Sequence, residues 1–185
     1  MGMDILTPDS KLNARTTDKV HENTLVPSAE NAREYRNALG HFGTGVTVIT
    51  ASTDEGPIGM TVNSFASVSL EPALVLWSLS KTSGRFEAFQ SAAHYSIHVM
   101  RENQEWLALE FAKNPDAFNR CDWRHHENGV PLLMSALTRF DCTQQAVHDA
   151  GDHIIIVGQV AAVVANEGEP LIFAKGKFGG FSPQG

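Results

Sequence analysis

The sequence predicts a mainly β protein that folds as a closed antiparallel barrel with a few peripheral helices. Segments rich in Val, Ile and Thr, which favour strands, follow one another along most of the chain. Tight turns carrying Gly, Pro, Asp or Asn separate them, and few segments show the helical spacing of apolar residues. Many strands with short connections are most simply accommodated in a barrel, which removes the exposed sheet edges.

Length and composition bound the domain organisation. A chain of 185 residues suits one domain, or one domain with an appendage. With 42% hydrophobic residues it can bury a full core. Residues 1–27 are polar, show no periodicity and end at Pro27, so we expect a mobile N-terminal arm followed by a single domain over residues 28–185.

Charge and cysteine content indicate the compartment and exclude some partners. A net charge of −7 and a pI near 5.5 argue against a nucleic-acid partner. No apolar run approaches the ~20 residues of a membrane span, and the N-terminus has no signal-peptide pattern. Cys121 and Cys142 lack metal-ligand spacing and are interpreted as reduced thiols. We therefore expect a cytoplasmic protein without a membrane partner.

The first helix is expected from Ser28, a capping residue, to about Gly40. Apolar residues at i, i+4 and i+7 give it one apolar stripe, formed by Tyr35, Leu39 and Phe42. Two glycines then open a strand over residues 46–51. They do not form a dinucleotide-binding fingerprint, which needs a strand before it, a helix after it and a third glycine.

Residues 59–72, GMTVNSFASVSLEP, are expected to form one strand with two dissimilar faces. One parity is apolar and predicted to face the core, with Ser64 as its exception; it comprises Met60, Val62, Ala66, Val68 and Leu70. The other parity carries Thr61, Asn63, Phe65, Ser67 and Ser69. No charge occurs from Gly59 to Leu70. Such a face suits a flat ligand with polar edges, and the alternative is an ordinary edge strand rich in Ser and Thr.

The remaining elements follow from the same patterns. An apolar run predicts a strand buried on both faces, and spacing of apolar residues predicts two further helices. The expected elements are a strand over 73–79, a short helix from near Thr82 or Ser83, a strand over 93–100, a helix from Asn103, and strands near 137–147, 153–165 and 171–175.

The segment VLWSLSKTSGRF, residues 75–86, is a candidate phosphate site. It places hydroxyls and two cations between a buried strand and an expected helix start, where unpaired backbone N–H groups favour anions. A solvated turn is the alternative when the segment is taken alone. A planar ligand with a phosphate tail explains this segment and the neutral polar strand together. The residues concerned are Ser80, Lys81, Thr82, Ser83 and Arg85.

The segment AGDHIIIVGQV, residues 150–160, places Asp152 and His153 immediately before a strand. The carboxylate can orient or charge the imidazole ring. Taken alone, the segment is better interpreted as a simple turn. His94 and His98 have the H-x-x-x-H spacing of helical zinc sites, but on a strand this spacing separates them by about 13 Å, so we expect no metal site.

Four segments together resemble the short-chain flavin reductases, the reductase components of two-component flavin-dependent monooxygenases. They are YRNALGHFGTGVTVIT (35–50), GMTVNSFASVSLEP, SLSKTS and GDHIIIVGQV, in that order, and the likeness runs from about residue 33 to residue 183. The resemblance implies an FMN-binding split β-barrel of Greek-key type. It also implies a homodimer that binds FMN or FAD near the dimer interface and uses NADH or NADPH.

The resemblance implies roles for individual residues. Ser80, Lys81 and Ser83 would hold the flavin phosphate. His153, beside Asp152, would be the catalytic residue in contact with the nicotinamide nucleotide. The isoalloxazine ring and ribityl chain would lie along Thr61, Asn63, Ser64, Phe65 and Ser67.

Two positions depart from the family pattern. Arg85 stands where a small residue is frequent, so the phosphate end of the site is expected to differ. Phe178 stands where a tyrosine is common, which keeps a ring for stacking and removes a hydroxyl with its hydrogen bond.

The expected activity is hydride transfer from NAD(P)H to flavin, followed by release of reduced flavin to a separate oxygenase component. The transfer needs two stacked rings at near-attack distance and no strong general acid or base. One alternative is an oxidase that retains its FMN, like the pyridoxamine-phosphate-oxidase relatives of this barrel. Another is a non-catalytic flavin-binding or electron-transfer protein, which would leave NADH untouched.

Overall fold

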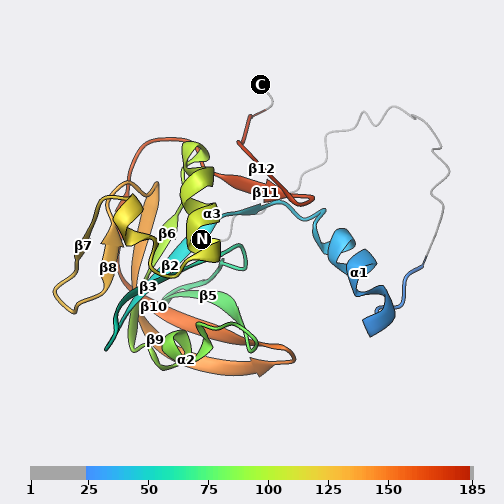
Figure 1. Ribbon diagram of the computed structural model, residues 1–185, viewed down its shortest axis with the longest axis horizontal. Helices are drawn as coiled ribbons and strands as arrows, with labels where there is room; N and C mark the ends of the chain where they lie inside the picture. Colours follow the sequence, from blue (N-terminus) through green and yellow to red (C-terminus); the bar gives the residue numbers. More distant parts are fainter. Residues whose placement is uncertain (1–23, 184–185) are drawn as a thin grey trace.

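A computed structural model describes residues 24–183 of the chain. The predicted N-terminal arm, residues 1–27, lies mostly outside the described residues. Strands dominate the structure, every strand pair is antiparallel, and a few short helices lie around the sheet (Figure 1). The prediction of a mainly β, antiparallel fold is confirmed.

Seven strands form the main sheet, in the order β3-β2-β6-β9-β10-β5-β4. The long hairpin of β9 and β10 lies near the middle of this order, and its turn lies at the lower right of the barrel in Figure 1. Their bounds are β2 Thr47–Thr53, β3 Gly56–Val62, β4 Ala66–Leu70, β5 Ala73–Ser80, β6 His94–Val99, β9 Thr138–Ala150 and β10 His153–Ala165.

The two edge strands of this sheet, β3 and β4, are consecutive in sequence. Only residues 63–65 join β3 to β4, so the two edges of the sheet lie next to each other at this link. No backbone pairing joins β3 to β4 in the described chain, and we call this unpaired boundary the seam. The barrel is therefore split along this seam rather than closed. The prediction of one continuous strand over residues 59–72 is wrong, because the chain leaves one edge at Val62 and enters the other at Ala66.

The break also changes which residues face the core. Met60, before the break, is buried as predicted, whereas Val68 and Leu70 are 50% and 94% exposed. Alternation along a strand holds only while the strand is continuous, so the core-facing parity predicted from Met60 does not carry through to β4.

The main core fills the inside of the barrel. Trp77 of β5 is fully buried, and its ring meets those of Phe89 and Tyr95 edge-on, with centroids 5.6 and 5.9 Å apart. Phe89 comes from α2, Phe86–Ser91, which covers one end of the barrel. Strand β5 was predicted to be buried on both faces, but only alternate residues are buried, so its second face is partly open.

A second core lies between α3, Glu105–Lys113, and the outer face of β2 and β3. Phe111 of α3 packs so closely on β3 that a Cβ at position 59 would lie 2.5 Å from its ring, which explains the glycine there. This core positions the C-terminal end of α3 beside β3. Its buried members include Val46, Val48, Leu107, Phe118 and Leu171.

The small elements complete the molecule. Helix α1 projects from the barrel in Figure 1, and its predicted apolar stripe of Tyr35, Leu39 and Phe42 is exposed. None of the helices in residues 24–183 is long and apolar enough to cross a membrane. The remaining elements are η1 Ala29–Asn31, α1 Ala32–Leu39, β1 Thr44–Gly45, η2 Glu102–Gln104, η3 Ala117–Arg120, β7 Trp123–His125, β8 Pro131–Leu133, β11 Ile172–Ala174 and β12 Lys177–Gly179.

The histidine pair of the H-x-x-x-H segment has structural contacts. Both residues lie on β6. His98 is fully buried: its Nδ1 lies 3.1 Å from the Val48 carbonyl oxygen, and its Nε2 accepts a hydrogen bond from the Leu133 N–H at 3.0 Å. His94 is exposed and contacts the Thr143 hydroxyl at 3.3 Å. The described residues contain no cluster of three or more potential metal ligands.

Candidate active site

The pairing of β5 with β10 brings together two segments that the sequence analysis singled out. Ser80, the last residue of β5, pairs with His153, the first residue of β10. Beyond this pair, the Lys81 N–H donates to the Asp152 carbonyl at 3.0 Å, and the Lys81 ammonium bonds to the Gly151 carbonyl at 2.6 Å and pairs with Asp149. The predicted phosphate turn and the Gly-Asp-His turn therefore form one polar cluster.

Asp152 holds the imidazole of His153, as the sequence indicated it can. The carboxylate oxygen lies 2.7 Å from Nδ1, and this hydrogen bond, with the charge of the ring, lowers the pKa of Asp152. The His153 side chain is 42% exposed, so its second ring nitrogen is available to a ligand. A carboxylate bonded to Nδ1 fixes the orientation of the ring and leaves Nε2 as the nitrogen that a ligand can reach.

The turn after β5 differs from the expected helix start. Helix α2 begins at Phe86 rather than near Thr82 or Ser83, and it has only six residues. Side chains order the turn instead: the Ser83 hydroxyl accepts from the Arg85 N–H at 3.2 Å and lies 3.8 Å from the Met60 sulfur. An anion at this turn would be held by side chains and turn amides, not by a long helix.

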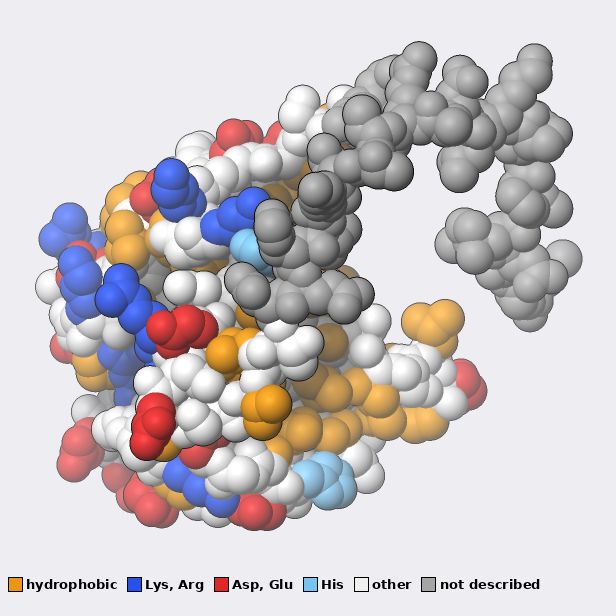
Figure 2. Space-filling model, turned by 90° about the vertical axis from the view of Figure 1, so that its right-hand side faces the viewer, with side chains coloured by type: hydrophobic (Ala, Val, Ile, Leu, Met, Phe, Trp, Pro, Cys, Tyr) orange, Lys and Arg blue, Asp and Glu red, His pale blue; other side chains and the backbone are white. Residues whose placement is uncertain are grey.

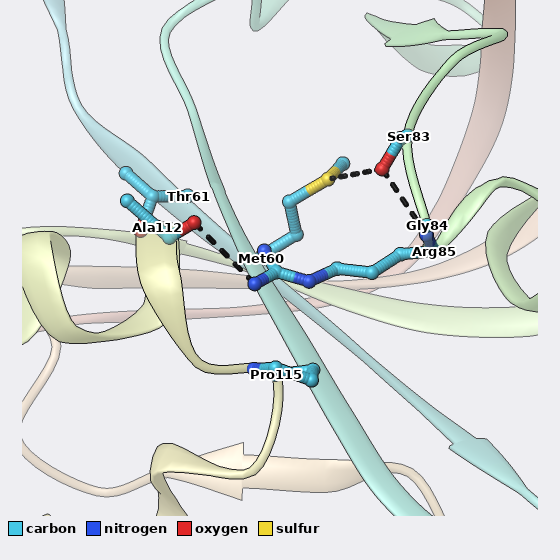
Figure 3. A pocket seen from close by; sticks show the side chains of 7 residues that line it. All are labelled: Met60, Thr61, Ser83, Gly84, Arg85, Ala112 and Pro115. Carbon is cyan, nitrogen blue, oxygen red and sulfur yellow. Dashed lines mark hydrogen bonds between the residues drawn. The ribbon is translucent and has the colours of Figure 1, made fainter.

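A pocket of about 480 Å³ opens next to this turn, between β3 and the end of α3 (Figure 3). Its size lies in the range of small-molecule sites. The Thr61 hydroxyl donates to the Ala108 carbonyl at 2.6 Å and ties β3 to α3. The pocket is lined by Met60, Thr61, Ser83, Gly84, Arg85, Ala112 and Pro115.

Arg85 is the charged group of this pocket. Its guanidinium donates to the carbonyl oxygens of Phe111 at 2.8 Å and of Ala112 at 3.4 Å, and its burial lowers its pKa. The sequence analysis placed Arg85 among the cations of the candidate phosphate segment and noted it as a departure from the family pattern, but it could not predict the contacts with α3, whose residues are distant in the chain. The signal in the sequence that Arg85 belongs to the site was its position close to Ser83 in the candidate phosphate segment.

The other predicted flavin residues lie at the seam of the barrel. The Ser64 hydroxyl accepts from the Ser78 N–H at 3.0 Å and donates to the Ser78 carbonyl at 3.1 Å, so it ties the seam to β5. Phe65 stacks on Phe140 with ring centroids 5.5 Å apart. Asn63 and Ser67 are exposed. The structure thus uses Ser64 and Thr61 for bonds within the chain and leaves Asn63 and Ser67 open.

Phe178 is not brought to this site within one chain. It lies on β12 and packs against Phe173 with ring centroids 5.0 Å apart. Strand β12 and helix α2 are at opposite ends of the molecule in Figure 1. Its predicted role in flavin binding stays a prediction.

The residues of the site suit a flavin nucleotide. The pocket offers a cation and a serine hydroxyl at one end, which match a phosphate, and neutral groups of β3 next to them. Gly84 faces open space, since a Cβ there would meet no atom within 4 Å, and the backbone can be approached closely. A split barrel with a pocket in the small-molecule range and an oriented histidine is compatible with a flavin-dependent oxidoreductase.

Comparison with known proteins agrees with a flavin-dependent oxidoreductase. Residues 39–182 match the flavin reductase like domain. The chain is 54% identical over 164 residues to the FMN reductase (NADH) SmoA of Agrobacterium fabrum, covering 89% of this chain and 94% of that protein. It is 39% identical over 156 residues to HsaB, the reductase subunit of a flavin-dependent monooxygenase from Mycobacterium tuberculosis, covering 82% and 83% of the two chains.

Solved structures give the same family. The Streptomyces globisporus NADH:FAD oxidoreductase SgcE6 superposes with a TM-score of 0.81 at 33% identity, covering 88% of this chain and 99% of that one. The chain belongs to the flavin reductase-like family, which confirms the family and the split barrel that the sequence indicated. It is an NAD(P)H-dependent flavin reductase.

Proposed function

We propose that this protein reduces FMN with NADH and releases the reduced flavin to a separate oxygenase component. The observation that carries the proposal is the joining of an oriented histidine, His153, to the polar turn at Ser80–Arg85 beside a nucleotide-sized pocket. The choice of NADH, FMN and an oxygenase partner is supported by the names of the relatives, an NADH-dependent FMN reductase and a monooxygenase reductase subunit.

The residues of the chain act by binding and orientation. When bound, the flavin supplies the hydride-accepting ring, and the nicotinamide supplies the hydride. Ser83 and Arg85 would hold the flavin phosphate, with Ser80 and Lys81 at the neighbouring turn. His153, fixed by Asp152 through Nδ1, would contact the nicotinamide nucleotide with Nε2 and orient it toward the flavin. No side chain has to remove a proton from carbon, in agreement with the absence of a carboxylate among the residues lining the pocket.

A homodimer is part of the proposal. Figure 2 shows apolar side chains gathered in the lower right part of one face of the molecule. Exposed apolar residues also occur on β4 and the second half of β10, with Leu70 94%, Val163 54% and Val164 41% exposed. Burying such a surface against a second copy would remove an apolar area that single proteins seldom expose. The free thiols of Cys121 and Cys142 suit a reducing compartment, and we propose a cytoplasmic location.

The test is NADH consumption by the purified protein with and without added FMN or FAD. The expected result is turnover that needs added flavin, saturates with it and requires no other substrate. If flavin binds but both NADH and NADPH persist, the protein is not a flavin reductase. Consumption that needs a further organic substrate and no free flavin would instead indicate an oxidase that retains its FMN.

A further inference from the structure

Arg85 lies across the pocket rather than at its rim. In Figure 3 its side chain extends from the Ser83–Arg85 turn to the end of α3. The guanidinium is held there by the carbonyl oxygens of Phe111 and Ala112, at 2.8 and 3.4 Å. These carbonyls belong to the last turn of α3, where the helix dipole is negative and favours a cation. The arginine is therefore fixed in place before any ligand binds.

The charge of Arg85 has no carboxylate partner among residues 24–183. A guanidinium has five N–H donors, and the carbonyls of Phe111 and Ala112 are its only acceptors in that part of the chain. A half-buried cation whose remaining donors face a pocket favours an anion there. The ion pairs of the described chain are Lys81–Asp149, Arg139–Asp141 and His153–Asp152.

The geometry favours a terminal phosphate over one inside a longer chain. A phosphate monoester carries a charge of about −1.5 to −2 and three free acceptor oxygens. Two of these oxygens can accept hydrogen bonds together from the planar fork of a guanidinium. In FMN the flavin side chain ends in such a monoester. In FAD the phosphate continues through a second phosphate to adenosine, and each phosphate carries one charge.

We propose that Arg85 sets the flavin preference of the enzyme by binding the terminal phosphate of FMN and obstructing the adenosine end of FAD. Because Arg85 spans the pocket from the turn to α3, the extension of FAD must displace the guanidinium from the two carbonyls or leave the pocket by its open side. This inference rests on the proposed flavin reductase function and adds to it a residue that discriminates between flavins.

The experiment measures the affinities of FMN, FAD and riboflavin for the full-length protein by quenching of flavin fluorescence. The variants are Arg85→Thr, which removes the charge, and Arg85→Lys, which keeps the charge without the fork. Lys113→Thr is the matched control, because it removes a positive charge at the same end of α3 from an exposed residue that does not line the pocket. Riboflavin is the internal reference, since it has no phosphate.

Arg85→Thr is expected to weaken FMN binding about 10- to 100-fold, the range for a lost charge-assisted hydrogen bond, and to leave FAD binding unchanged or tighter because the obstruction is removed. Riboflavin affinity should stay within 2-fold, ~0.4 kcal/mol. Arg85→Lys should fall between Arg85→Thr and the wild type, and Lys113→Thr should match the wild type.

Equal loss for all three flavins would show that Arg85 only supports the fold of the pocket and would overturn the proposal. Unchanged FMN affinity in Arg85→Thr, or an equal loss in Lys113→Thr, would overturn it as well. Failure of the proposed function is recognised separately: the wild type would then bind flavin without consuming NADH or NADPH.

Discussion

His98 should make the stability of this protein fall steeply in mild acid. The ring is fully buried on β6, with Nδ1 donating to the Val48 carbonyl and Nε2 accepting from the Leu133 N–H. Both nitrogens are used by the neutral ring, so a proton added to Nε2 would break the bond from Leu133. Burial lowers the pKa of His98 to about 4, against the raising effect of the hydrogen bond with Val48; Arg139 lowers the pKa further and Asp141 raises it.

The sign and size of the effect follow from proton binding. The unfolded chain takes up a proton near pH 6.5, whereas the folded chain does so only near pH 4. Stability from this group is therefore complete above pH 6.5 and is lost as the pH falls. Linkage gives a loss of about 2 kcal/mol at pH 5 and about 3 kcal/mol at pH 4, relative to pH 7.5.

The assay is urea unfolding at fixed protein concentration, followed by tryptophan fluorescence at pH 7.5 and pH 5. The wild type is compared with His98→Gln, which is neutral at both pH values. The variant should be less stable at pH 7.5 because it loses packing and hydrogen bonds, but its stability should fall about 2 kcal/mol less on acidification. Equal losses in the two proteins would refute this account of His98.

Three other outcomes are expected. Gly158→Ala should lower the free energy of unfolding by about 1 to 3 kcal/mol in thermal or urea unfolding, because its Cβ would lie 2.1 Å from the Tyr95 hydroxyl oxygen in the core; wild-type stability would contradict that packing. His153→Ala should raise the KM for NADH about 10-fold while the affinity for FMN changes little, as measured by steady-state kinetics and fluorescence titration; a selective loss of FMN affinity would place the residue elsewhere in the site. The double substitution Leu70→Glu and Val164→Glu should convert the proposed dimer into a monomer, as measured by light scattering after gel filtration, and a dimer of unchanged strength would assign the interface to another surface.

Much of the fold could be predicted because its signals are local. Alternation and β-branched residues predict the hairpin of β9 and β10, although β9 runs to Ala150, three residues beyond the predicted end. The seam between β3 and β4 was not predicted, because residues 59–72 keep their polar composition and apolar spacing across the break. The single signal was Ser64, a polar residue on the apolar parity, which bonds to the backbone of Ser78.

The candidate site could also be predicted only as far as its signals are local. Ser80, Lys81, Asp152 and His153 were each identified from residue type and position relative to a strand. Their meeting depends on the register of β5 with β10, in which Ser80 is opposite His153, and single-sequence patterns carry no information on that register. The contacts of Arg85 depend on the packing of α3 on β3, which is equally invisible in the pattern.

The order of strands in the sheet has a consequence for folding kinetics. The pairs β2–β3, β4–β5 and β9–β10 are hairpins of neighbouring strands, whose contacts cost little loop-closure entropy. The β5–β10 pair instead joins segments more than 70 residues apart, such as Ser80 and His153. Such high contact-order pairing belongs to the slow part of folding. The turn proposed to hold the flavin phosphate and the histidine proposed to contact the nicotinamide therefore meet only in that slow part, so recovery of activity on refolding should follow the slowest phase and not the early gain of strand content.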